Sequence, residues 1–297
     1  MSSIERYFVN ETINHASAGF ETNRSSLLKS FAIIVLSCLL PACAQPVEKD
    51  LPIDGGEVFR VGDQTAFLIL PEKSKSDDLI PWVWYAPTLT GLPAAEEKWM
   101  FEQFLSNGIA IAGVDVGESN GSPKGRSVYS KLHKELTERR GLAPKACLLA
   151  RSRGGLMLYN WAAENPEYVA CIAGIYPVCN LRSYPGLARA CDAYGMSEEQ
   201  LAAELVEHNP IDRLAPLAKA KVPIFHIHGD SDSVVPLDKN SGVVKERYDR
   251  LGGEMELEIV KGQGHNMWSG WFNSQRLVDF VIAHGKDQSK NSTQSID

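Results

Sequence analysis

Short apolar runs recur along the chain between residues 56 and 260, and several of them contain no polar position at all. Continuous runs of this kind are typical of strands that are buried on both faces, as in a parallel sheet covered by helices. The first segment predicts two short strands around a Gly-Asp turn, and each later run predicts one strand. The predicted strands occupy 56–70 (two strands), 82–86, 109–116, 145–150, 168–178, 222–229 and 255–260.

Segments with helical spacing separate these runs. The segment 125–141 places Val128, Leu132 and Leu136 on one face and ends at Gly141, a residue type that commonly ends helices. The alternation of strands and helices predicts an α/β fold built on a mostly parallel, doubly wound sheet. The predicted helices occupy 125–141, 156–165, 239–253 and 271–285.

The interval 179–221 breaks this alternation, because it lies between two strands but is longer than one helix requires. It contains Ser197 and Gln200 in the spacing of a capping box, which marks the start of a helix. We expect the interval to form a small helical cap inserted over the carboxyl edge of the sheet. The helix at 271–285 then closes the domain, and residues 286–297 are expected to be a polar, disordered tail.

The composition is that of a globular protein, with 44% hydrophobic and 23% charged residues in a chain of 297 and a formal net charge of -7. The body of the chain has no basic block, which argues against a nucleic-acid partner, since phosphate binding needs clustered Lys and Arg. No run in the body is long and apolar enough to span a bilayer. No Cys/His spacing resembles a zinc site, and no metal or other cofactor is expected.

The first 45 residues differ in character from the rest of the chain. The apolar run FAIIVLSCLL at 31–40 follows two basic residues and precedes a small-residue segment, which is the pattern of a secretory signal. Ala42-Cys43-Ala44 fits a cleavage site, whereas Leu40-Pro41-Ala42-Cys43 resembles a lipoprotein box with Pro41 as a poor fit. We therefore expect a secreted or periplasmic protein, with membrane attachment through a lipidated Cys43 as the alternative.

The stretch ARSRGG at 150–155 lies where an apolar run changes to helical spacing. A serine at a strand-to-helix turn with the pattern x-Ser-x-Gly forms a nucleophile elbow. The turn strains the backbone at the serine, so its close neighbours must be small, and here they are Ala150, Gly154 and Gly155. Ser152 would then project at a helix N-terminus, which favours developing negative charge. The alternative is that Ser152 only caps the helix.

A serine hydroxyl needs a base, and the base needs an acid that orients it. The segment HGDSDSVVP at 228–236 is a strand end followed by acids in a turn. The segment KGQGHNMW at 261–268 is a glycine-bracketed loop around His265. Both follow strands of the predicted sheet, so they lie on the same edge as the serine. The candidates also occur in the order serine, acid, histidine that the elbow fold requires.

These motifs resemble those of the α/β-hydrolases, and specifically the catalytic domains of the prolyl oligopeptidase and dienelactone hydrolase group. The resemblance covers about residues 56–284. It implies Ser152 as the nucleophile, Asp232 as the acid and His265 as the base. Asp230, the other acid of the motif, is then expected to be a turn residue that accepts hydrogen bonds from local amides.

Other histidines and cysteines have structural interpretations. His226 and His228 lie within or at the end of a buried strand, and we expect both to be structural. Cys179 and Cys191 lie in a loop-like segment, where export would permit a disulfide between them.

The oxyanion that forms during acyl transfer needs two donors. One is expected from the backbone N–H of Arg153, the residue after the nucleophile. The second usually comes from the loop after the strand at 82–86, where Pro87 has no N–H to donate. Dipeptidyl peptidases use a tyrosine hydroxyl at a similar stretch, and this resemblance implies Tyr85 as the second donor. The alternative is that Tyr85 is an ordinary core residue.

The two arginines beside the serine also need a reason. Arg153 resembles the arginine of the Ser-Arg pair in glucuronoyl esterases, which assists oxyanion binding; alternatively, it binds an acidic group of the substrate in a bidentate fork. Arg151 is expected to pair with an acid, for which the loop 115–122 offers candidates. Trp268 is a candidate for stacking on a sugar, although aromatic residues near strands more often belong to the core.

Together these residues predict an exported serine hydrolase that cleaves a carboxylic ester, with an acyl or uronoyl ester on a carbohydrate as the candidate substrate. An ester is favoured because the peptidases of the resembling group select peptides with an N-terminal propeller, which the residues before the sheet are too few to form. A prolyl-oligopeptidase-like peptidase and a lactone hydrolase are the alternatives. A non-catalytic binding module with the same fold is the alternative from another class.

Overall fold

The computed structural model describes residues 48–72 and 79–291. The chain divides after Gln45 into two compact units, and the second, which begins at Pro46, contains all the described residues. The expected leader, 1–45, and the last part of the expected tail, 292–297, lie outside the described residues. Within the described ranges, no helix is long and apolar enough to cross a membrane.

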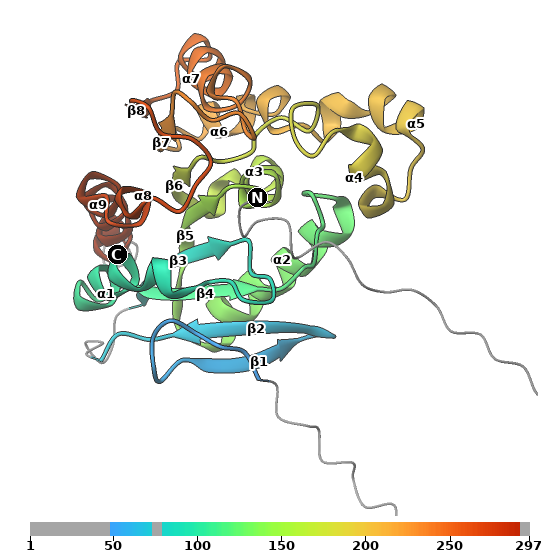
Figure 1. The fold of residues 1–297 in the computed structure, drawn as a ribbon. Coiled ribbons are helices and arrows are strands. Elements are labelled where there is room, and N and C mark those ends of the chain that lie inside the picture. Colours follow the sequence, from blue (N-terminus) through green and yellow to red (C-terminus); the bar gives the residue numbers. More distant parts are fainter. Residues whose placement is uncertain (1–47, 73–78, 292–297) are drawn as a thin grey trace, which may run out of the picture. The chain divides into compact units, whose positions relative to one another are not determined.

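The centre of the domain is an eight-stranded sheet with the order β1-β2-β4-β3-β5-β6-β7-β8 (Figure 1). The pairs β1–β2 and β2–β4 are antiparallel, and every other neighbouring pair is parallel. The mostly parallel α/β sheet predicted from the apolar runs is therefore confirmed. The strands are β1 Glu57–Val61, β2 Gln64–Ile69, β3 Ile80–Ala86, β4 Ala110–Val114, β5 Leu142–Arg151, β6 Val169–Ile175, β7 Ile224–Gly229 and β8 Met255–Val260.

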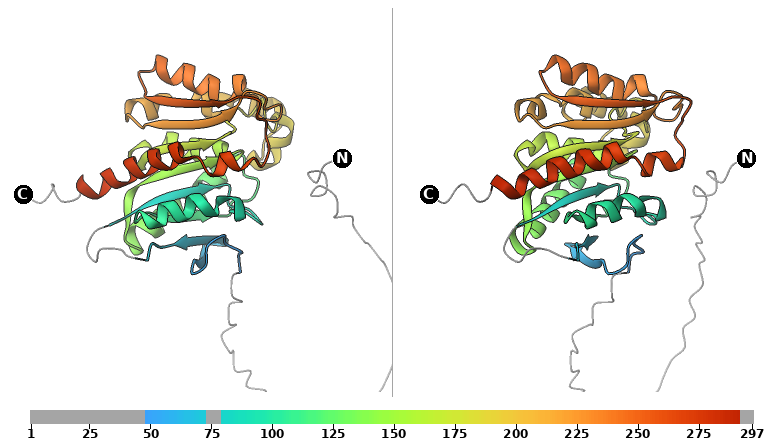
Figure 2. Two further views of the ribbon diagram at one scale, coloured as in Figure 1. Left: turned by 60° about the vertical axis from the view of Figure 1, so that its left-hand side comes forward. Right: turned by 90° about the vertical axis from the view of Figure 1, so that its left-hand side faces the viewer.

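Helices cover both faces of the sheet (Figure 2). Residues of α1, α8 and α9 share one apolar core with one face, and residues of α2, α3, α6 and α7 share a second core with the other face. Alternate side chains of β3 enter different cores, with Trp84 on the α3 side and Tyr85 on the α1 side. The helices are α1 Lys98–Ser106, α2 Pro123–Arg139, α3 Gly154–Glu164, α6 Ala215–Lys219, α7 Ser241–Arg250, α8 Ser269–Phe272 and α9 Gln275–Asn291.

The insertion between β6 and β7 contains two further short helices, α4 Leu187–Tyr194 and α5 Glu198–Ala203, which lie beside α3 in Figure 1. The capping box at the start of α5 is formed as expected. The N–H of Gln200 donates to the Ser197 hydroxyl, and the N–H of Ser197 donates to the Gln200 side chain. A third, smaller apolar cluster joins this insertion to Leu156 of α3 and to Val235, which follows β7.

The structure differs from the sequence-based elements at three places. Helix α1 was not predicted; its Met100, Phe101 and Phe104 are buried against the sheet. The predicted helix 271–285 is two helices, α8 and α9, and α9 continues to Asn291, past the expected start of the tail. These are short or terminal segments, where the apolar pattern is brief and helix boundaries are least well determined by sequence.

The disulfide considered between Cys179 and Cys191 is not formed, and both cysteines are free. Cys179 is buried after β6, where its backbone N–H donates to the side chain of Asn240. Cys191 lies on α4, and its thiol donates to the carbonyl of Leu187 one turn earlier. The two thiols therefore belong to different packing environments despite their closeness in sequence.

Candidate active site

Ser152 lies at a sharp turn between β5 and α3. Its backbone has φ of +49°, a left-handed conformation that is strained for any residue with a side chain. A Cβ atom at Gly154 would lie 2.1 Å from the carbonyl oxygen of Ala86, and one at Gly155 would lie 2.3 Å from that of Val178. The turn is therefore possible only because glycine occupies both positions, as the elbow motif requires.

The structure brings Ser152, His265 and Asp232 together at the carboxyl edge of the sheet. The Ser152 hydroxyl oxygen is 2.9 Å from His265 Nε2, and His265 Nδ1 is 2.8 Å from Asp232 Oδ2. Because a carboxylate can only accept, Nδ1 carries the proton and Nε2 is free to accept from the serine. This is the arrangement in which a histidine can remove the hydroxyl proton of a nucleophilic serine.

The Asp232 carboxylate is held firmly in its charged form. Its Oδ1 accepts from the backbone N–H groups of Val234 at 3.0 Å and Val235 at 2.8 Å. Burial by itself would raise the pKa of this carboxyl, but hydrogen bonds from His228, from His265 and from the Val235 N–H outweigh burial and hold the pKa well below its usual value. The acid is therefore ionised throughout the physiological pH range.

Asp230 has the turn role expected for it. Its carboxylate accepts from the backbone N–H of Gly262 at 2.7 Å and from the hydroxyl of Ser231. These contacts tie the turn after β7 to the loop after β8, which carries His265. Asp230 thus supports the position of the loop, while Asp232 contacts the histidine itself.

Two residues that sequence reasoning did not single out shape the surroundings of His265. The ring of Tyr176, which follows β6, lies 4.4 Å from the imidazole between ring centroids, and burial raises the pKa of this tyrosine to about 12. The Asn266 side chain accepts from the backbone N–H of Trp268 and from the indole N–H of Trp271. Two features of the sequence could have pointed to them. Asn266 is a polar residue next to His265, and Tyr176 directly follows β6, which pairs with the strand that carries Ser152.

Tyr85, the second oxyanion donor implied by the resemblance to dipeptidyl peptidases, lies in the core of the structure. Its side chain is fully buried in the α1-side core, and its hydroxyl donates to Glu97 at 2.9 Å. Burial, reinforced by the Glu97 charge, raises the pKa of Tyr85 well above its ordinary value. These surroundings agree with the alternative interpretation, a core tyrosine, because strand alternation directs this side chain into the α1-side core.

The backbone N–H of Arg153 remains available as an oxyanion donor. Within residues 48–72 and 79–291 it donates to no backbone carbonyl. Arg153 stands immediately before the first residue of α3, so its N–H belongs to the positive end of the helix.

Both arginines pair with acids: Arg151 does so as expected, although not with the suggested loop. Arg151 does not pair with the loop 115–122; it forms a buried ion pair with Glu97, and its guanidinium lies 4.9 Å from the ring centroid of Phe272. The loop acid Glu118 pairs instead with Arg153, at 3.2 Å. Glu97 immediately precedes α1 and is far from Arg151 in sequence, so its role was not visible in any local motif.

Exposed apolar side chains occur close in sequence to the acid and the base of the triad. Val234, Met267 and Trp268 are exposed by 47%, 49% and 40%, and each lies within three residues of Asp232 or His265. Trp268 packs edge-on against Trp271 at 5.1 Å between ring centroids. These three exposed apolar residues, which follow the acid and the base of the triad in the sequence, are called the apolar rim.

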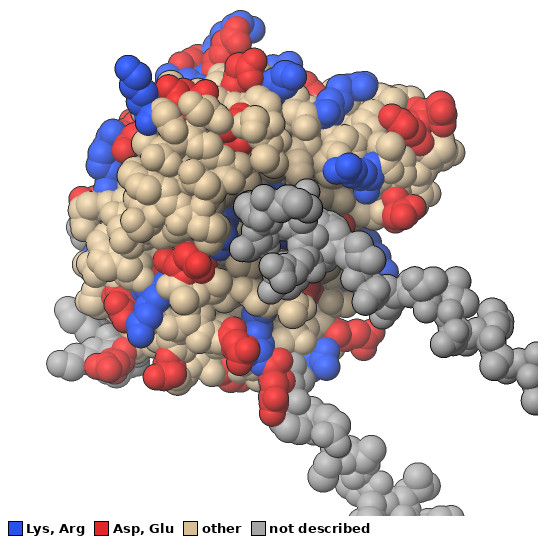
Figure 3. Space-filling view, viewed as in Figure 1, with Lys and Arg blue, Asp and Glu red and all other residues tan. Residues whose placement is uncertain are grey.

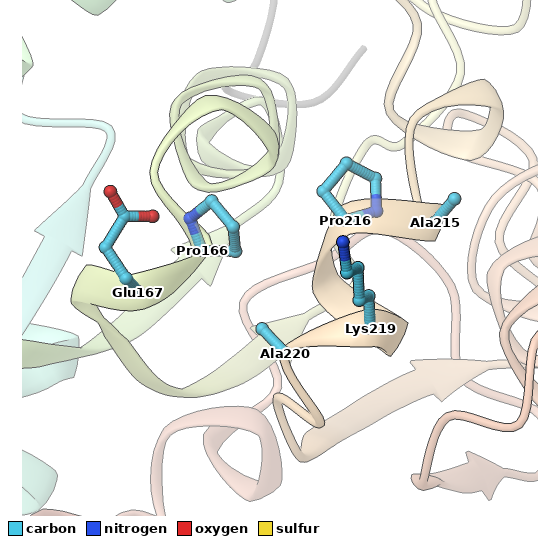
Figure 4. A pocket seen from close by; sticks show the side chains of 6 residues that line it. All are labelled: Pro166, Glu167, Ala215, Pro216, Lys219 and Ala220. Carbon is cyan, nitrogen blue, oxygen red and sulfur yellow. The ribbon is translucent and has the colours of Figure 1, made fainter.

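Other surface features lie elsewhere. A cleft of about 670 Å³ between Pro166–Glu167 and Ala215–Ala220 (Figure 4) is at the amino ends of β6 and β7, opposite the edge that carries Ser152. On the face in Figure 3, acidic and basic side chains are interspersed. The described residues contain no group of three or more His, Cys, Asp or Glu side chains placed to hold a metal ion.

A strained serine at the end of a central parallel strand, followed by an acid and a histidine at the ends of later strands, defines an α/β-hydrolase. A family model described as the prolyl oligopeptidase family matches residues 133–289, which is more than half of the chain and includes all three residues. The chain belongs to this family. A search of curated proteins found no match.

Solved structures share the fold at low sequence identity. A puromycin-hydrolyzing peptidase of Mycobacterium tuberculosis matches with a TM-score of 0.61 and 16% identity over 78% of this chain and 40% of its own. An S-formylglutathione hydrolase from Agrobacterium tumefaciens matches with 0.63 and 16% over 81% and 98%. A carbohydrate esterase from gut microbiota matches with 0.56 and 15% over 76% and 90%. This chain thus spans well under half of the peptidase.

Proposed function

We propose that this protein is an exported serine hydrolase that cleaves a carboxylic ester through an acyl-enzyme. The observation that carries the proposal is the continuous hydrogen-bonded line from Ser152 through His265 to Asp232 on a strained elbow. The three residues are a hydroxyl nucleophile, an imidazole base and an ionised carboxylate, so no member of the triad is missing. A complete triad argues against a non-catalytic binding module. Export, with or without lipid on Cys43, is part of the proposal and is supported by the sequence of residues 1–45.

The reaction follows from the geometry. His265 Nε2 accepts the hydroxyl proton as Ser152 Oγ attacks the ester carbonyl, and Asp232 stabilises the imidazolium that forms. The oxyanion is stabilised by the Arg153 N–H at the start of α3. His265 then gives its proton to the departing alkoxide, and a water molecule, activated by the same imidazole, hydrolyses the acyl-enzyme.

The surroundings favour a substrate with both an apolar and a polar part. The apolar rim can contact an acyl chain, or Trp268 can stack on the face of a sugar ring. The Arg153 side chain is paired with Glu118, whose side chain is itself about half exposed, so a substrate carboxylate could replace Glu118 as its partner. An acyl or uronoyl ester on a carbohydrate has both features.

A peptidase activity is the second candidate, because the chain belongs to the prolyl oligopeptidase family and one of its structural neighbours is a puromycin-hydrolyzing peptidase. Both reactions use the same nucleophile and the same acyl-enzyme. They differ in the leaving group, since an amine must be protonated to depart whereas an activated alkoxide need not be.

The test is the hydrolysis of p-nitrophenyl acetate and butyrate by the purified chain and by Ser152→Ala, with aminoacyl p-nitroanilides and a simple lactone assayed beside them. We expect ester hydrolysis that is lost in the variant and exceeds anilide hydrolysis. Faster anilide cleavage would make the protein a peptidase. Failure of a fluorophosphonate to label the folded wild-type chain, while it labels a control hydrolase, would overturn the enzyme assignment.

A further inference from the structure

A second histidine lies against the triad acid from inside the core. His228 is the penultimate residue of β7, and its side chain is completely buried. Its Nε2 lies 2.8 Å from the carbonyl oxygen of Val235 and 3.3 Å from Asp232 Oδ2. The same Val235 donates its backbone N–H to Asp232 Oδ1. One imidazole therefore contacts both the carboxylate and the turn that holds it.

The position of the proton on His228 follows from its partners. A carbonyl oxygen can only accept, so Nε2 carries the proton and points it between Val235 and Asp232. Nδ1 is then an acceptor, and it lies 2.8 Å from the hydroxyl of Ser241 at the start of α7. The Ser241 proton is therefore directed toward His228.

The same reasoning assigns the protons of two further hydrogen bonds in the core, and together these contacts form a line from Tyr159 through His226 and Ser241 to His228. Because the Ser241 proton is used, its oxygen accepts from His226 Nδ1 at 2.9 Å. His226 Nε2 is then an acceptor and receives the hydroxyl proton of Tyr159 on α3, at 2.7 Å. Burial, together with the neighbouring His228, lowers the pKa of His226 to about 3, so the ring is neutral, as this assignment requires. Every proton in the line points from Tyr159 toward Asp232.

The line is a built feature of the fold. Tyr159, His226, Ser241 and His228 are all essentially inaccessible to solvent, where polar groups are costly unless each is paired. Room for the His226 ring exists only because residue 174 is glycine, since a Cβ there would lie 2.5 Å from His226 Cδ2. Apolar side chains could fill the same volume without the need to pair each polar group. The polar residues are instead present, and their line ends at Asp232, the carboxylate that contacts His265.

We propose that His228 is a positioning residue for the triad: its Nε2–H, directed by the line Tyr159–His226–Ser241, holds Asp232 in the orientation in which the carboxylate accepts from His265. The inference rests on the proposed hydrolase function. Asp232 then accepts from two backbone N–H groups on Oδ1 and from His265 on Oδ2, and His228 Nε2 lies 3.3 Å from Oδ2 as a fourth contact, which together match the lone pairs of a carboxylate. The remaining freedom of the acid to rotate away from His265 is removed.

The contact also affects the charge that faces His265. A donor on Oδ2 draws charge from the carboxylate, so its loss would strengthen the attraction between Asp232 and the imidazolium that forms during acyl transfer, and the acid limb of the pH–rate profile should move to higher pH. Substitution of His228 replaces none of the other titratable or charged groups that face the line. These groups are Cys179 and Tyr248 near Tyr159, Asp232 and His265 at the triad, and Tyr176, Arg151 and Glu97 beyond His265.

The experiment compares His228→Leu, which removes the donor, with His228→Gln, whose amide places an N–H near the position of Nε2. The readouts are the pH profile of kcat/KM for the ester and the rate of fluorophosphonate labelling of Ser152. We expect His228→Leu to lose about 10-fold, the value of one hydrogen bond to a charged group, with the acid limb of the profile shifted to higher pH. His228→Gln should stay within about 3-fold of wild type with little shift.

Tyr248→Phe is the matched control, since it removes a buried hydrogen bond, from the Tyr248 hydroxyl to the carbonyl of Val222, that is not part of the line. We expect it to lower the melting temperature and leave the pH profile unchanged. If His228→Leu and His228→Gln lose activity equally, or if neither shifts the acid limb, His228 only packs the core and the proposal is wrong.

A second pair keeps the proposal testable if the His228 variants do not fold. Ser241→Ala removes the donor to His228 Nδ1 and should shift the acid limb in the same direction by a smaller amount, whereas Ser241→Thr keeps the hydroxyl and should restore the wild-type profile. An unshifted profile in Ser241→Ala would again overturn the proposal. Failure of the proposed function itself has a different signature, because the folded wild-type chain would then not be labelled at Ser152 at all.

Discussion

The hydroxyl oxygen of Ser152 lies 2.9 Å from Nε2 of His265, although 113 positions separate the two residues in the sequence. They follow β5 and β8, and two strands lie between these in the sheet. The loop after β8 must therefore fold back across the end of β7. Gly229 makes this possible, since a Cβ there would lie 2.0 Å from the carbonyl oxygen of Gln263 in that loop.

The two acids of the motif after β7 should respond differently to the same change. Asp232→Asn keeps the shape but cannot hold His265 in the required tautomer, so ester hydrolysis should fall by about 10³–10⁴-fold. Asp230→Asn weakens only the contact with Gly262 and should change the rate by less than about 10-fold. Measurement of kcat/KM for both variants decides the matter, and equal losses would contradict the assignment of Asp232 as the acid.

The arginines on either side of Ser152 should also differ. Arg151→Ala leaves Glu97 buried without its cation, and we expect a loss of about 3–5 kcal/mol in the free energy of unfolding. Arg153→Ala breaks a partly exposed pair with Glu118 and should cost less than about 1 kcal/mol. Urea denaturation of both variants tests this, and a larger cost for Arg153→Ala would show that the pairing described here is incorrect.

Tyr85→Phe separates a core tyrosine from an oxyanion donor. Loss of an oxyanion donor reduces kcat by about 10²–10³-fold. Because the Tyr85 hydroxyl donates to Glu97 inside the core, we expect kcat within about 3-fold of wild type and a loss of about 1–3 kcal/mol in stability. Steady-state kinetics and thermal unfolding of the same preparation distinguish the outcomes, and a large fall in kcat would restore Tyr85 to the site.

Stability should fall as the pH decreases below about 6.5, the ordinary pKa of histidine in the unfolded chain. The pKa of His226 in the folded chain is about 3. Between these values the unfolded state binds a proton that the folded state does not, so the free energy of unfolding rises with pH, by up to about 1.4 kcal/mol per pH unit. Asp232, whose folded pKa is depressed, contributes fully above about pH 4 and loses its contribution only below it.

The measurement is the melting temperature between pH 7 and pH 4.5 for the wild type and for His226→Gln. His133 and His208 also have pKa values lowered by burial, so the difference between the two proteins, rather than the wild-type slope, isolates His226. We expect a shallower dependence in His226→Gln. Parallel curves for the two proteins would contradict the neutral, buried state of His226.

The sequence by itself determined the features that depend on near neighbours along the chain. Apolar runs located the eight strands, because a strand buried on both faces needs apolar side chains whatever it pairs with. The elbow at Ser152 was visible because its requirement for Gly154 and Gly155 is local. The choice of Asp232 over Asp230 came from the resemblance of HGDSDSVVP to the motif of the prolyl oligopeptidase group, in which the acid takes the fifth place.

Only the tertiary structure decided which distant groups meet. Glu97, from the segment before α1, forms an ion pair with Arg151 and accepts a hydrogen bond from the hydroxyl of Tyr85. These contacts hold the Tyr85 hydroxyl in the core. The line behind His228 is likewise assembled from distant segments, because Tyr159 comes from α3 and Ser241 from α7. The physical reason is the same in each case. A buried charged or polar group needs a partner, and the packing of distant strands and helices decides which partner it meets. That packing cannot be read from any local stretch of the sequence.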